Sequence, residues 1–408
     1  MNNPKIIISE GDVVGNKGAV AMVFTLINGI RKKYPEAEFI ITSKFIKNPD
    51  YFNNPKIKLL YDNEQAFDIP LLKLWIWWLF SKAGIKFNFL LKDKVLSLYK
   101  DADLIISASG ISFHESFGWI KIYHFSKYIQ IPLFLSKKVV KFTQSIGPFE
   151  SWYNKLMAKL ILPEIDYIFG RGKHSERNLK KLGITENVKI FPDIAITMEM
   201  RKNSDIDDII NKFSGQKIIG ISPNIVCKQL DKKENYIPAL KKLTEYIIEK
   251  YNDVILLFIP HTIEEGHLNK EDDYSICKYL HENIMESNRS EIINTLEFSP
   301  EETKYLISKC DFFIGSRFHS LIAAISSSVP GIAIGWHWKY EEMMDWLEIE
   351  NNVIQYWNLT TEKLIDMFNF NYNNREKIKK QMLLKIPKIQ EKAKEAIEIT
   401  IGMIDEKD

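Results

Sequence analysis

The sequence predicts an α/β protein built from two doubly wound domains, each a parallel β-sheet covered by helices on both faces. Short apolar runs alternate with helix-length amphipathic segments along the chain, which is the pattern of parallel sheets. The chain has 408 residues, more than one ordinary core accommodates. A polar stretch at residues 201–208 separates two such alternating series.

The first series predicts an N-terminal domain over residues 1–200. Residues 48–100 follow the alternation less well, and we expect a helical excursion there that includes the tryptophan-rich segment 69–80. The apolar runs predict strands at residues 5–9, 38–42, 104–107, 139–143, 167–170 and 188–191. The amphipathic segments predict helices at residues 19–33, 120–135, 153–162 and 175–182.

The second series predicts a C-terminal domain over residues 210–373, followed by a terminal helix over 374–408. Ser299 before Pro300 is a typical helix start, with a capping hydroxyl and a proline in the first turn. Lys, Glu, Leu and Ile recur at helical spacing from residue 374 to 401. Strands are expected at 217–221, 254–258, 312–314 and 332–334, and helices at 236–250, 273–282, 301–309 and 320–327.

Composition excludes several classes of partner and site. Lys and Arg total 55 against 53 Asp and Glu, so the chain lacks the basic excess of a nucleic-acid-binding protein. The three cysteines are widely separated and form no CxxC pair, which argues against a zinc site and fits the reducing cytoplasm. The N-terminus lacks the long apolar core of a signal peptide. We expect a cytoplasmic protein that needs neither metal nor cofactor.

The segment 69–80 raises the question of membrane contact. It is too short to span a bilayer and is interrupted by Lys73. Its three tryptophans suit a membrane interface, which allows peripheral contact at the inner face of the membrane. The alternative, which we favour, is a core or interdomain helix.

The segment Gly315–Ser320 is the most informative part of the chain. It follows an apolar run and precedes small helix-forming residues, so it predicts a turn between a strand and a helix. A helix start attracts anions, and Ser316, Arg317 and Ser320 add donors for phosphate or carboxylate. His319 adds an acid or base that titrates near neutral pH. The segment therefore points to an enzyme that acts on an acidic small molecule.

Other loops that follow predicted strands contain small or polar residues. Because ligands of open parallel sheets bind at the carboxyl ends of strands, these loops are candidates for the wall of an interdomain cleft. Each also suits a tight packing turn. They contain Asn16 and Gly18, Gly110, and Gln144 and Ser145.

Further strand-end residues have two readings each. Arg171 either points into the cleft or forms a salt bridge at its rim. His261 either contacts a ligand or only caps its loop. Trp336 either stacks on a sugar or seals the domain interface. Helix capping explains at least one of Asp272 and Asp273.

These strand-end loops together resemble the polysaccharide pyruvyl transferase family. The matching pieces occur in the order typical of the family and at the same strand-end positions. Many members carry Asp where this chain has Ala19. The pieces are residues 16–19 with 21–22, 144–148, Arg171 with Ser175, 182–183, 192–193 and 315–320.

The resemblance implies two Rossmann-like domains facing a cleft in a GT-B-like arrangement. It also implies transfer of a pyruvyl group from phosphoenolpyruvate to a sugar diol, with release of phosphate and formation of a cyclic ketal. The acceptor would be a sugar or a lipid-linked oligosaccharide, bound on the side of the N-terminal domain.

This chemistry suggests roles for the candidate residues. His319 would protonate the methylene carbon of the donor, with Arg317 beside it. The expected donor-binding residues are Arg171, Arg317, Ser316, Ser320 and His261. The expected acceptor residues are Asn16, Gly18, Gly110, Gln144, Ser145 and Trp336.

Two other functions fit the same pattern. One is a GT-B glycosyltransferase that uses a nucleotide sugar. The other is a non-catalytic protein that binds a glycan or an anion in a degenerate cleft. The presence of Arg317, His319 and Arg171 favours an active enzyme.

Overall fold

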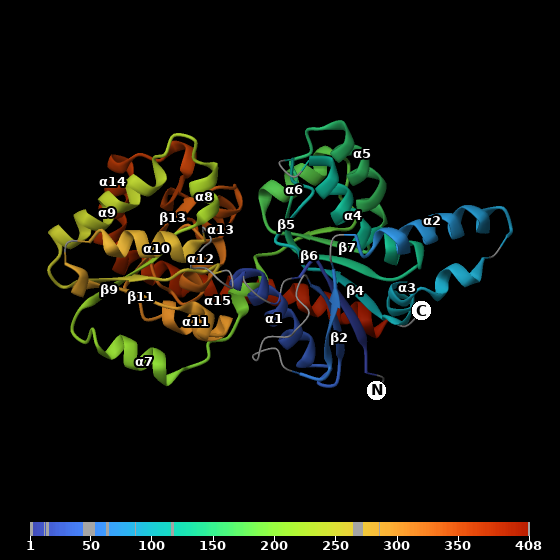
Figure 1. Ribbon diagram of the computed structural model, residues 1–408, viewed down its shortest axis with the longest axis horizontal. Coiled ribbons are helices and arrows are strands. Elements are labelled where there is room, and N and C mark those ends of the chain that lie inside the picture. Colours follow the sequence, from blue (N-terminus) through green and yellow to red (C-terminus); the bar gives the residue numbers. More distant parts are fainter. Residues whose placement is uncertain are drawn as a thin grey trace. The chain divides into compact units, whose positions relative to one another are not determined.

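Two parallel β-sheets organise the chain in the computed structural model (Figure 1). The structure describes residues 3–406 except 12, 14–15, 44–53, 63–64, 86, 116–117, 264–271 and 285. The chain divides into unit 1, which comprises Met1–Val14, Met22–Ile194 and Lys392–Asp408, and unit 2, which comprises Gly15–Ala21 and Ala195–Glu391. The predicted α/β fold class with two parallel sheets is confirmed, whereas the three-part domain division predicted from sequence stays a prediction.

Unit 1 contains an eight-stranded sheet in the order β3-β2-β1-β4-β6-β7-β8, with β5 paired to β6. Every printed strand pair in it is parallel. The strands are β1 Lys5–Ser9, β2 Glu38–Ser43, β3 Ile57–Tyr61, β4 Leu104–Ser107, β5 Ile111–Ser112, β6 Val139–Ile146, β7 Tyr167–Gly170 and β8 Val188–Ile190. The helices are α1 Lys17–Arg31, whose first residues belong to unit 2, α2 Asp68–Lys82, α3 Lys94–Asp101, α4 Gly118–Phe134, α5 Trp152–Ile161 and α6 Lys173–Lys181.

Unit 2 contains a six-stranded parallel sheet in the order β11-β10-β9-β12-β13-β14. Its strands are β9 Lys217–Ser222, β10 Val254–Phe258, β11 Ser290–Ile292, β12 Phe312–Gly315, β13 Gly331–Gly335 and β14 Val353–Gln355. Its helices are α7 Ser204–Asn211, α8 Ile225–Leu230, α9 Tyr236–Lys250, α10 Asp273–Glu282, α11 Pro300–Ile307, α12 Phe318–Ser326, α13 Lys339–Leu347, α14 Thr361–Asn373 and most of α15 Arg375–Asp405.

The strand order of each sheet reverses at one point. In unit 2 the first strand, β9, lies between β10 and β12, so the chain proceeds outward in one direction and then in the other. In unit 1 the same reversal falls between β1 and β4. Loops leaving the two strands at such a point diverge to opposite faces of the sheet and leave a crevice where ligands bind. The turn at Gly315–Ser320 follows β12 and therefore lies at the reversal point of unit 2.

The central strands are apolar on both faces because helices cover both sides of each sheet. All five residues of β10 and all four of β4 and β12 are buried. Such continuous burial is typical of parallel sheets. The helices α9 and α10 contribute Leu240, Leu243 and Leu280 to the core of unit 2, beside Phe258 and Phe312.

The strand β6 differs from its prediction in a way that matters for the candidate site. The strand was expected to end at Thr143, with Gln144 and Ser145 in the following loop. It continues to Ile146 because Ser145 and Ile146 pair with the short strand β5. Gln144 and Ser145 are therefore fully buried strand residues.

Several other elements were not predicted, among them the helices α8, α13 and α14 of unit 2. The strand β3 was missed inside the region expected to be a helical excursion, although the helices α2 and α3 of that region were anticipated. The short strands β11 and β14 at the two edges of the second sheet were also missed. The polar stretch 201–208 contains the start of α7, whose N-cap Asn203 accepts hydrogen bonds from the amides of Asp205 and Ile206.

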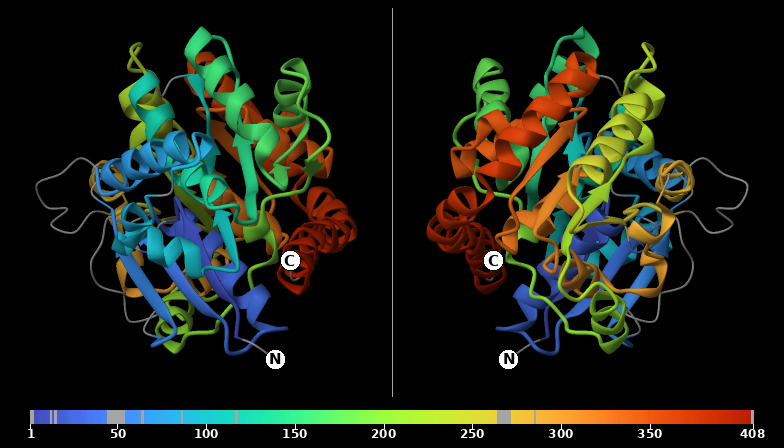
Figure 2. Two further views of the ribbon diagram at one scale, coloured as in Figure 1. Left: turned by 90° about the vertical axis from the view of Figure 1, so that its right-hand side faces the viewer. Right: turned by 90° about the vertical axis from the view of Figure 1, so that its left-hand side faces the viewer.

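The predicted terminal helix is confirmed as α15, which has 31 residues and is drawn in red in Figure 2, ending beside the C-terminus. Its last part packs on α1 within unit 1. A Cβ on Gly29 of α1 would lie 2.5 Å from Cδ1 of Ile397, so glycine permits this close approach. Asp405 near the end of α15 forms an ion pair with Lys33 at 2.5 Å.

Candidate active site

The turn after β12 is held by backbone hydrogen bonds at the reversal point of unit 2. The amide of Ser316 donates to the carbonyl of Ser222, the last residue of β9, at 2.8 Å. The carbonyl of Ser316 accepts from Asn224 Nδ2 at 3.0 Å and from the hydroxyl of Tyr340 at 2.7 Å. Arg317 has extended backbone angles and is the N-cap of α12. The predicted strand–turn–helix is thus present, and the turn is fixed from both neighbouring loops.

The guanidinium of Arg317 is held by a two-point ion pair to Asp273. Its Nε donates to Oδ2 of Asp273 and its Nη2 to Oδ1, each at 2.6 Å. Asp273 is fully buried, whereas 14% of the Arg317 side chain is exposed. Two parallel hydrogen bonds fix both the position and the plane of the guanidinium, which one bond does not.

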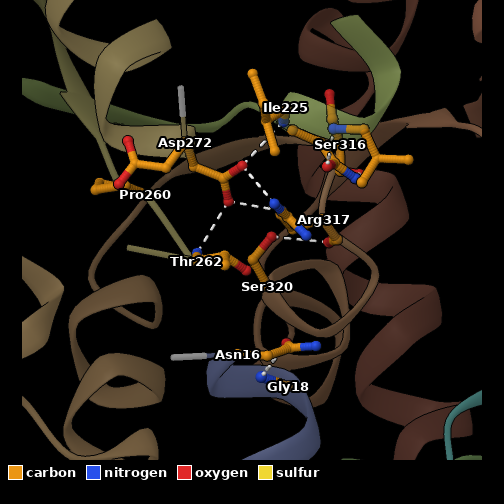
Figure 3. A network of polar contacts seen from close by, with 12 residues as sticks. Asn16, Gly18, Ile225, Pro260, Thr262, Asp272, Ser316, Arg317 and Ser320 are labelled. Carbon is orange, nitrogen blue, oxygen red and sulfur yellow. Dashed lines mark hydrogen bonds and ion pairs between the residues drawn. The ribbon is translucent and has the colours of Figure 1, made fainter. Parts of the chain in front are cut away.

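Asp273 also gathers the loops that follow neighbouring strands. Its carboxylate accepts from the amide of Ile225, in the segment after β9, and from the amide of Thr262, in the segment after β10, both at 2.9 Å. Figure 3 labels Ile225, Thr262 and Arg317 and marks their contacts with dashed lines. Loops after β10, β9 and β12 therefore meet at one buried anion.

Helix capping was expected to explain at least one of Asp272 and Asp273, and it explains Asp272. Asp272 is the N-cap of α10 and forms a capping box with Ser275. Asp273, one position later, accepts the four hydrogen bonds described above. An acidic pair at a helix start after a strand was the available signal, but it did not distinguish the two residues.

Arg317 keeps hydrogen-bonding capacity for a ligand. Its Nη1 makes no hydrogen bond to any residue that the structure describes, and its side chain is partly exposed. Burial by itself would lower the pKa of Arg317, but the charge and hydrogen bonds of Asp273, with Tyr340 and Cys227, together raise the pKa above its usual value. The side chain therefore presents a permanent positive charge and a spare NH2 group.

The ring of His319 lies against the first turn of α1, whose residues 17–21 belong to unit 2. A Cβ placed on Gly18 would come 2.1 Å from Nδ1 of His319, which no side chain permits. The amide of Gly18 is bound to Oδ1 of Asn16 at 3.1 Å (Figure 3). Asn16 also forms an isolated bridge with Thr262. The structure thus brings Asn16, Gly18, Thr262 and His319 together.

A small cavity of about 10 Å³ in unit 2 is shared by His261 and His319. This volume corresponds to about one water molecule. His261 is 6% exposed, and neither of its ring nitrogens has a hydrogen-bond partner among the described residues. Burial, together with the positive charges of His319, Arg317 and Lys17, holds the pKa of His261 well below its usual value. His261 is therefore a neutral imidazole at pH 7.

Two buried lysines also line this cavity. Lys17 donates to the carbonyl of Phe298, and Lys304 donates to the carbonyl of Met198. Burial lowers the pKa of Lys17 to about 8, although Glu302 opposes the shift. Burial likewise lowers the pKa of Lys304 to about 8. The surroundings of His319 are therefore basic, which suits an anionic ligand more than a cationic one.

Unit 2 also has a larger cavity of about 680 Å³, formed by residues of α8, α9 and α10 with the adjoining loop. Neither Arg317 nor His319 lines it. The larger cavity of unit 2 is therefore not the one that contains the candidate catalytic side chains. We assign the active site to the turn at Gly315–Ser320 because charge, hydrogen-bonding capacity and a titratable ring coincide there.

Trp336 lies beside a buried cation, and its expected contact with a sugar stays a prediction. The ammonium of Lys339 lies 4.7 Å from the ring centre of Trp336 and 5.0 Å from that of Phe318. Burial raises the pKa of the Cys227 thiol, although the positive charges of Arg317 and Lys339 favour the thiolate and oppose this shift. Lys339 was not among the residues predicted from sequence, although it follows β13 by four residues.

In unit 1 the guanidinium of Arg171 is turned inward. It is 2% exposed, and its Nη2 lies 2.8 Å from Oδ2 of the fully buried Asp193. Its Nε donates to the carbonyl of Thr143 at 3.1 Å. The second of the two sequence readings, a salt bridge, is therefore present, but it lies inside the unit and not at a rim. The role of Arg171 in donor binding stays a prediction.

Gln144 belongs to a buried polar cluster at the reversal point of unit 1. Its Nε2 donates to the carbonyl of Ser107 at 2.6 Å and to the hydroxyl of Ser107 at 2.8 Å. Lys141 donates to the same hydroxyl at 3.1 Å and lies 3.8 Å from the carboxylate of Glu10. The carboxylate of Glu10 accepts a further hydrogen bond from the hydroxyl of Ser107.

A bulge in β6 makes this cluster possible. Residues three apart in a regular strand point to opposite faces of the sheet. The register between β6 and β7 shifts between Lys141 and Gln144, and Thr143 has a φ of 42°. The extra residue resets the alternation so that both Lys141 and Gln144 reach Ser107. Neighbouring Ser145 is buried, whereas the space beside Gly110 is open.

Comparisons with known proteins bear on this geometry. Residues 16–337 match the model of the family described as polysaccharide pyruvyl transferase, and this span includes the turn with Arg317 and His319. The amylovoran biosynthesis protein AmsJ of Erwinia amylovora is 22% identical to the chain over 401 residues, which cover 93% of this chain and 94% of AmsJ.

Solved structures share the fold at low sequence identity. A UDP-GlcNAc 2-epimerase from Neisseria meningitidis, bound to UDP-GlcNAc, aligns with a TM-score of 0.59 at 13% identity and covers 98% of this chain and 100% of its own. A glycosyltransferase from Rickettsia africae aligns with a TM-score of 0.57 at 12% identity over the whole of both chains. These similarities establish the predicted GT-B-like class of fold.

Proposed function

Because the chain belongs to the polysaccharide pyruvyl transferase family, we propose that it moves a pyruvyl group from phosphoenolpyruvate to a sugar diol of a polysaccharide or its precursor. The products are a cyclic ketal and inorganic phosphate. The observation that carries this proposal is the guanidinium of Arg317, fixed by Asp273 and two residues before His319 on one turn. An anion-binding group and a proton-transferring group thus lie on one short segment.

Phosphoenolpyruvate carries a phosphate and a carboxylate, and the turn offers groups for both. The spare Nη1 of Arg317 provides N–H donors to an oxyanion, and the start of α12 favours negative charge. The hydroxyl of Ser316 is buried and has no hydrogen-bond partner among the described residues. The hydroxyl of Ser320 donates to the carbonyl of Arg317 at 2.8 Å, so we assign Ser320 to bracing the turn.

The chemistry begins with a proton transfer. His319 gives a proton to the methylene carbon of the donor, which becomes a methyl group and leaves the adjacent carbon cationic. A sugar hydroxyl adds to that carbon, and its proton returns to His319. The bond to the phosphate oxygen then breaks, the second hydroxyl closes the ring, and its proton leaves with the phosphate. General acid catalysis of this kind typically contributes roughly a hundredfold to ten-thousandfold.

We assign His261 to the electrostatic environment of His319. It is neutral and lines the small cavity together with His319, so it acts there as a hydrogen-bonding group and not as a charge. Its two ring nitrogens without partners allow it to bind a ligand oxygen or the one water that the cavity accommodates. The acceptor residues expected from sequence remain proposals, since Gln144 and Ser145 are buried inside β6.

One assay tests the proposal directly. The protein is incubated with phosphoenolpyruvate and a panel of glycans, and mass spectrometry detects glycans that have gained a pyruvyl ketal. Phosphate release should match ketal formation one to one. Consumption of a nucleotide sugar with no use of phosphoenolpyruvate would instead identify a glycosyltransferase.

The variant His319→Ala separates catalysis from binding. Turnover should fall by roughly a hundredfold or more, while calorimetry should show donor binding within a few-fold of the unchanged protein. A turnover within threefold of the unchanged protein would remove His319 as the proton donor.

A further inference from the structure

Unit 1 carries two stripes of exposed apolar side chains that its own core does not explain. On α2 the stripe consists of Ile69, Leu72, Ile76 and Leu79, spaced at three and four residues. On α5 it consists of Trp152, Leu156 and Leu160, spaced at four. Leu79 and Leu160 are each 62% exposed and Trp152 is 76% exposed. We call these seven residues the apolar face.

The helix α2 is apolar on both sides. Its inner side packs Leu71 and Leu74 into the core of unit 1, so the core already accounts for one side of the helix. A surface helix usually carries polar residues on the outer side. Large exposed apolar patches on soluble proteins mark interaction sites. The outer side of α2 therefore indicates a partner.

A groove of about 700 Å³ is lined by residues of both stripe-bearing helices, α2 and α5. Its apolar lining comes from three helices: Trp75 and Trp78 of α2, Leu133 and Phe134 of α4, and Met157 and Leu160 of α5. The ring centres of Trp75 and Phe134 are 5.0 Å apart, and those of Trp78 and Phe134 are 5.9 Å apart. Leu160 belongs to both the groove and the apolar face, and on α2 the groove residue Trp75 is itself 46% exposed next to Ile76 of the apolar face.

Lysines outnumber acidic residues in the segments that carry this surface. Residues 68–101 contain six lysines and three aspartates, with no arginine or glutamate. Lys155 and Lys159 are exposed and alternate with the apolar residues of α5. The ammonium of Lys82 lies 4.1 Å from the ring centre of Trp78, at the end of α2. Tryptophans with flanking lysines suit the boundary between lipid headgroups and acyl chains.

We propose that the apolar face of unit 1 docks on an anionic lipid surface, with α2 and α5 lying in the plane of the headgroups. Interfaces between protein copies are depleted in lysine, so a second copy of this chain suits the face less well. The helix α2 has 15 residues, about 22 Å long at 1.5 Å per residue, whereas a bilayer core is about 30 Å thick. Within the described residues, no helix has the length and apolarity required to cross a membrane.

Vesicle flotation tests this proposal with the full chain. Vesicles of phosphatidylcholine alone are compared with vesicles that also contain phosphatidylglycerol. The protein should float with the anionic vesicles, and the bound fraction should fall with added salt because surface charges are screened. The readout does not require pyruvyl transfer, so it can fail or succeed separately from the proposed function.

Two variants should reduce binding by different routes. The triple variant Leu72→Ser, Ile76→Ser and Leu79→Ser removes apolar contact, and affinity for anionic vesicles should fall more than about tenfold. The double variant Lys155→Glu and Lys159→Glu reverses charge, and affinity should again fall roughly tenfold or more. A control with Phe370→Ser and Leu384→Ser, which are 65% and 76% exposed in unit 2, should bind unchanged.

Three outcomes would overturn the proposal. The first is no flotation with either kind of vesicle, and the second is equal flotation with neutral and anionic vesicles. The third is a concentration-dependent dimer that the triple variant disrupts while no vesicle binding occurs, which would identify a second copy as the occupant. Matching thermal unfolding of the variants and the unchanged protein shows that any loss of binding is not a loss of folding.

Discussion

The imidazole ring of His319 rests directly on the backbone of Gly18. A Cβ at Gly18 would lie 2.1 Å from Nδ1 and 2.5 Å from Cγ of the ring. The two residues are 301 positions apart in the sequence, and both occupy the first turn of a helix. The position of the ring therefore depends on the absence of a side chain at residue 18.

The variant Gly18→Ala should displace the ring of His319. A methyl group cannot occupy that space, so the ring or the helix start has to move by more than a few tenths of an ångström. Misplacement of a catalytic group by about 1 Å can reduce the rate as much as a hundredfold. We expect kcat to fall at least about tenfold, measured by phosphate release from phosphoenolpyruvate with a glycan acceptor.

Gly402→Ala provides the matched control. Nothing lies within 4 Å of a Cβ at Gly402, which is inside α15. Alanine is favoured over glycine in a helix interior by up to about 1 kcal/mol, so this variant should be as active as the unchanged protein and no less stable. Equal activity of both alanine variants would show that the contact between Gly18 and His319 does not position the ring.

Asp273→Asn should loosen Arg317 and destabilise the fold. Whichever oxygen is replaced, the asparagine NH2 group would face one N–H group of Arg317 and one backbone amide, and it could not accept from either. Breaking a buried ion pair by changing one partner typically costs 3–5 kcal/mol, and about this loss should appear in denaturant unfolding. Donor affinity should fall as well, because the guanidinium is no longer held in one plane.

The neighbouring variant Asp272→Asn separates this role from helix capping. Asparagine caps helices about as well as aspartate, so unfolding free energy should change by less than about 1 kcal/mol. If both variants bind phosphoenolpyruvate like the unchanged protein in calorimetry, the assignment of Arg317 to the donor fails.

Lys141→Met should destabilise unit 1 through the charge it leaves behind. Lys141 and Glu10 are both buried, and without the ammonium the carboxylate of Glu10 remains unpaired. The expected loss is about 3–5 kcal/mol. The double variant Lys141→Met with Glu10→Gln should recover a large part of the lost stability, because residue 10 then carries no unpaired charge. Losses that simply add in the double variant would show that the two side chains are not coupled.

The pH dependence of stability should report the burial of Lys304. The pKa of Lys304 is about 8 in the folded protein against 10.5 unperturbed. Between these values the unfolded chain binds more protons than the folded one, so the unfolding free energy rises with pH. From about pH 8 to pH 10.5 the unfolding free energy should rise by roughly 3 kcal/mol through Lys304. Below about pH 8 this rise is absent, because the lysine is protonated in both states.

Lys304→Met removes that rise, whereas Lys379→Met, at an exposed position on α15, should retain it. Chemical denaturation at several pH values provides the comparison. If the difference between the unchanged protein and Lys304→Met stays constant from pH 8 to pH 10, Lys304 does not release its proton in this range.

Local patterns in the sequence determined most of the framework. The strands β1, β4 and β7 occupy the residues predicted for them, since short continuous apolar runs can be stable only between two layers of helices. Ser299 and Glu302 form the capping box that begins α11 beside Pro300. The turn at Gly315–Ser320 was also recognisable, because a strand, a tight turn and a helix follow one another without interruption.

The tertiary structure alone decided which side chains meet. The pairs Arg317 with Asp273, His319 with Gly18, Lys141 with Glu10 and Arg171 with Asp193 join residues from separate strand-end or helix-start segments. Periodicity and capping depend on neighbours a few positions away, whereas these contacts depend on the order of strands in the sheet. A bulge such as the one at Thr143 changes which face a residue occupies without altering the apolar pattern. For that reason the sequence indicated the candidate residues, and the strand order and local register settled their partners.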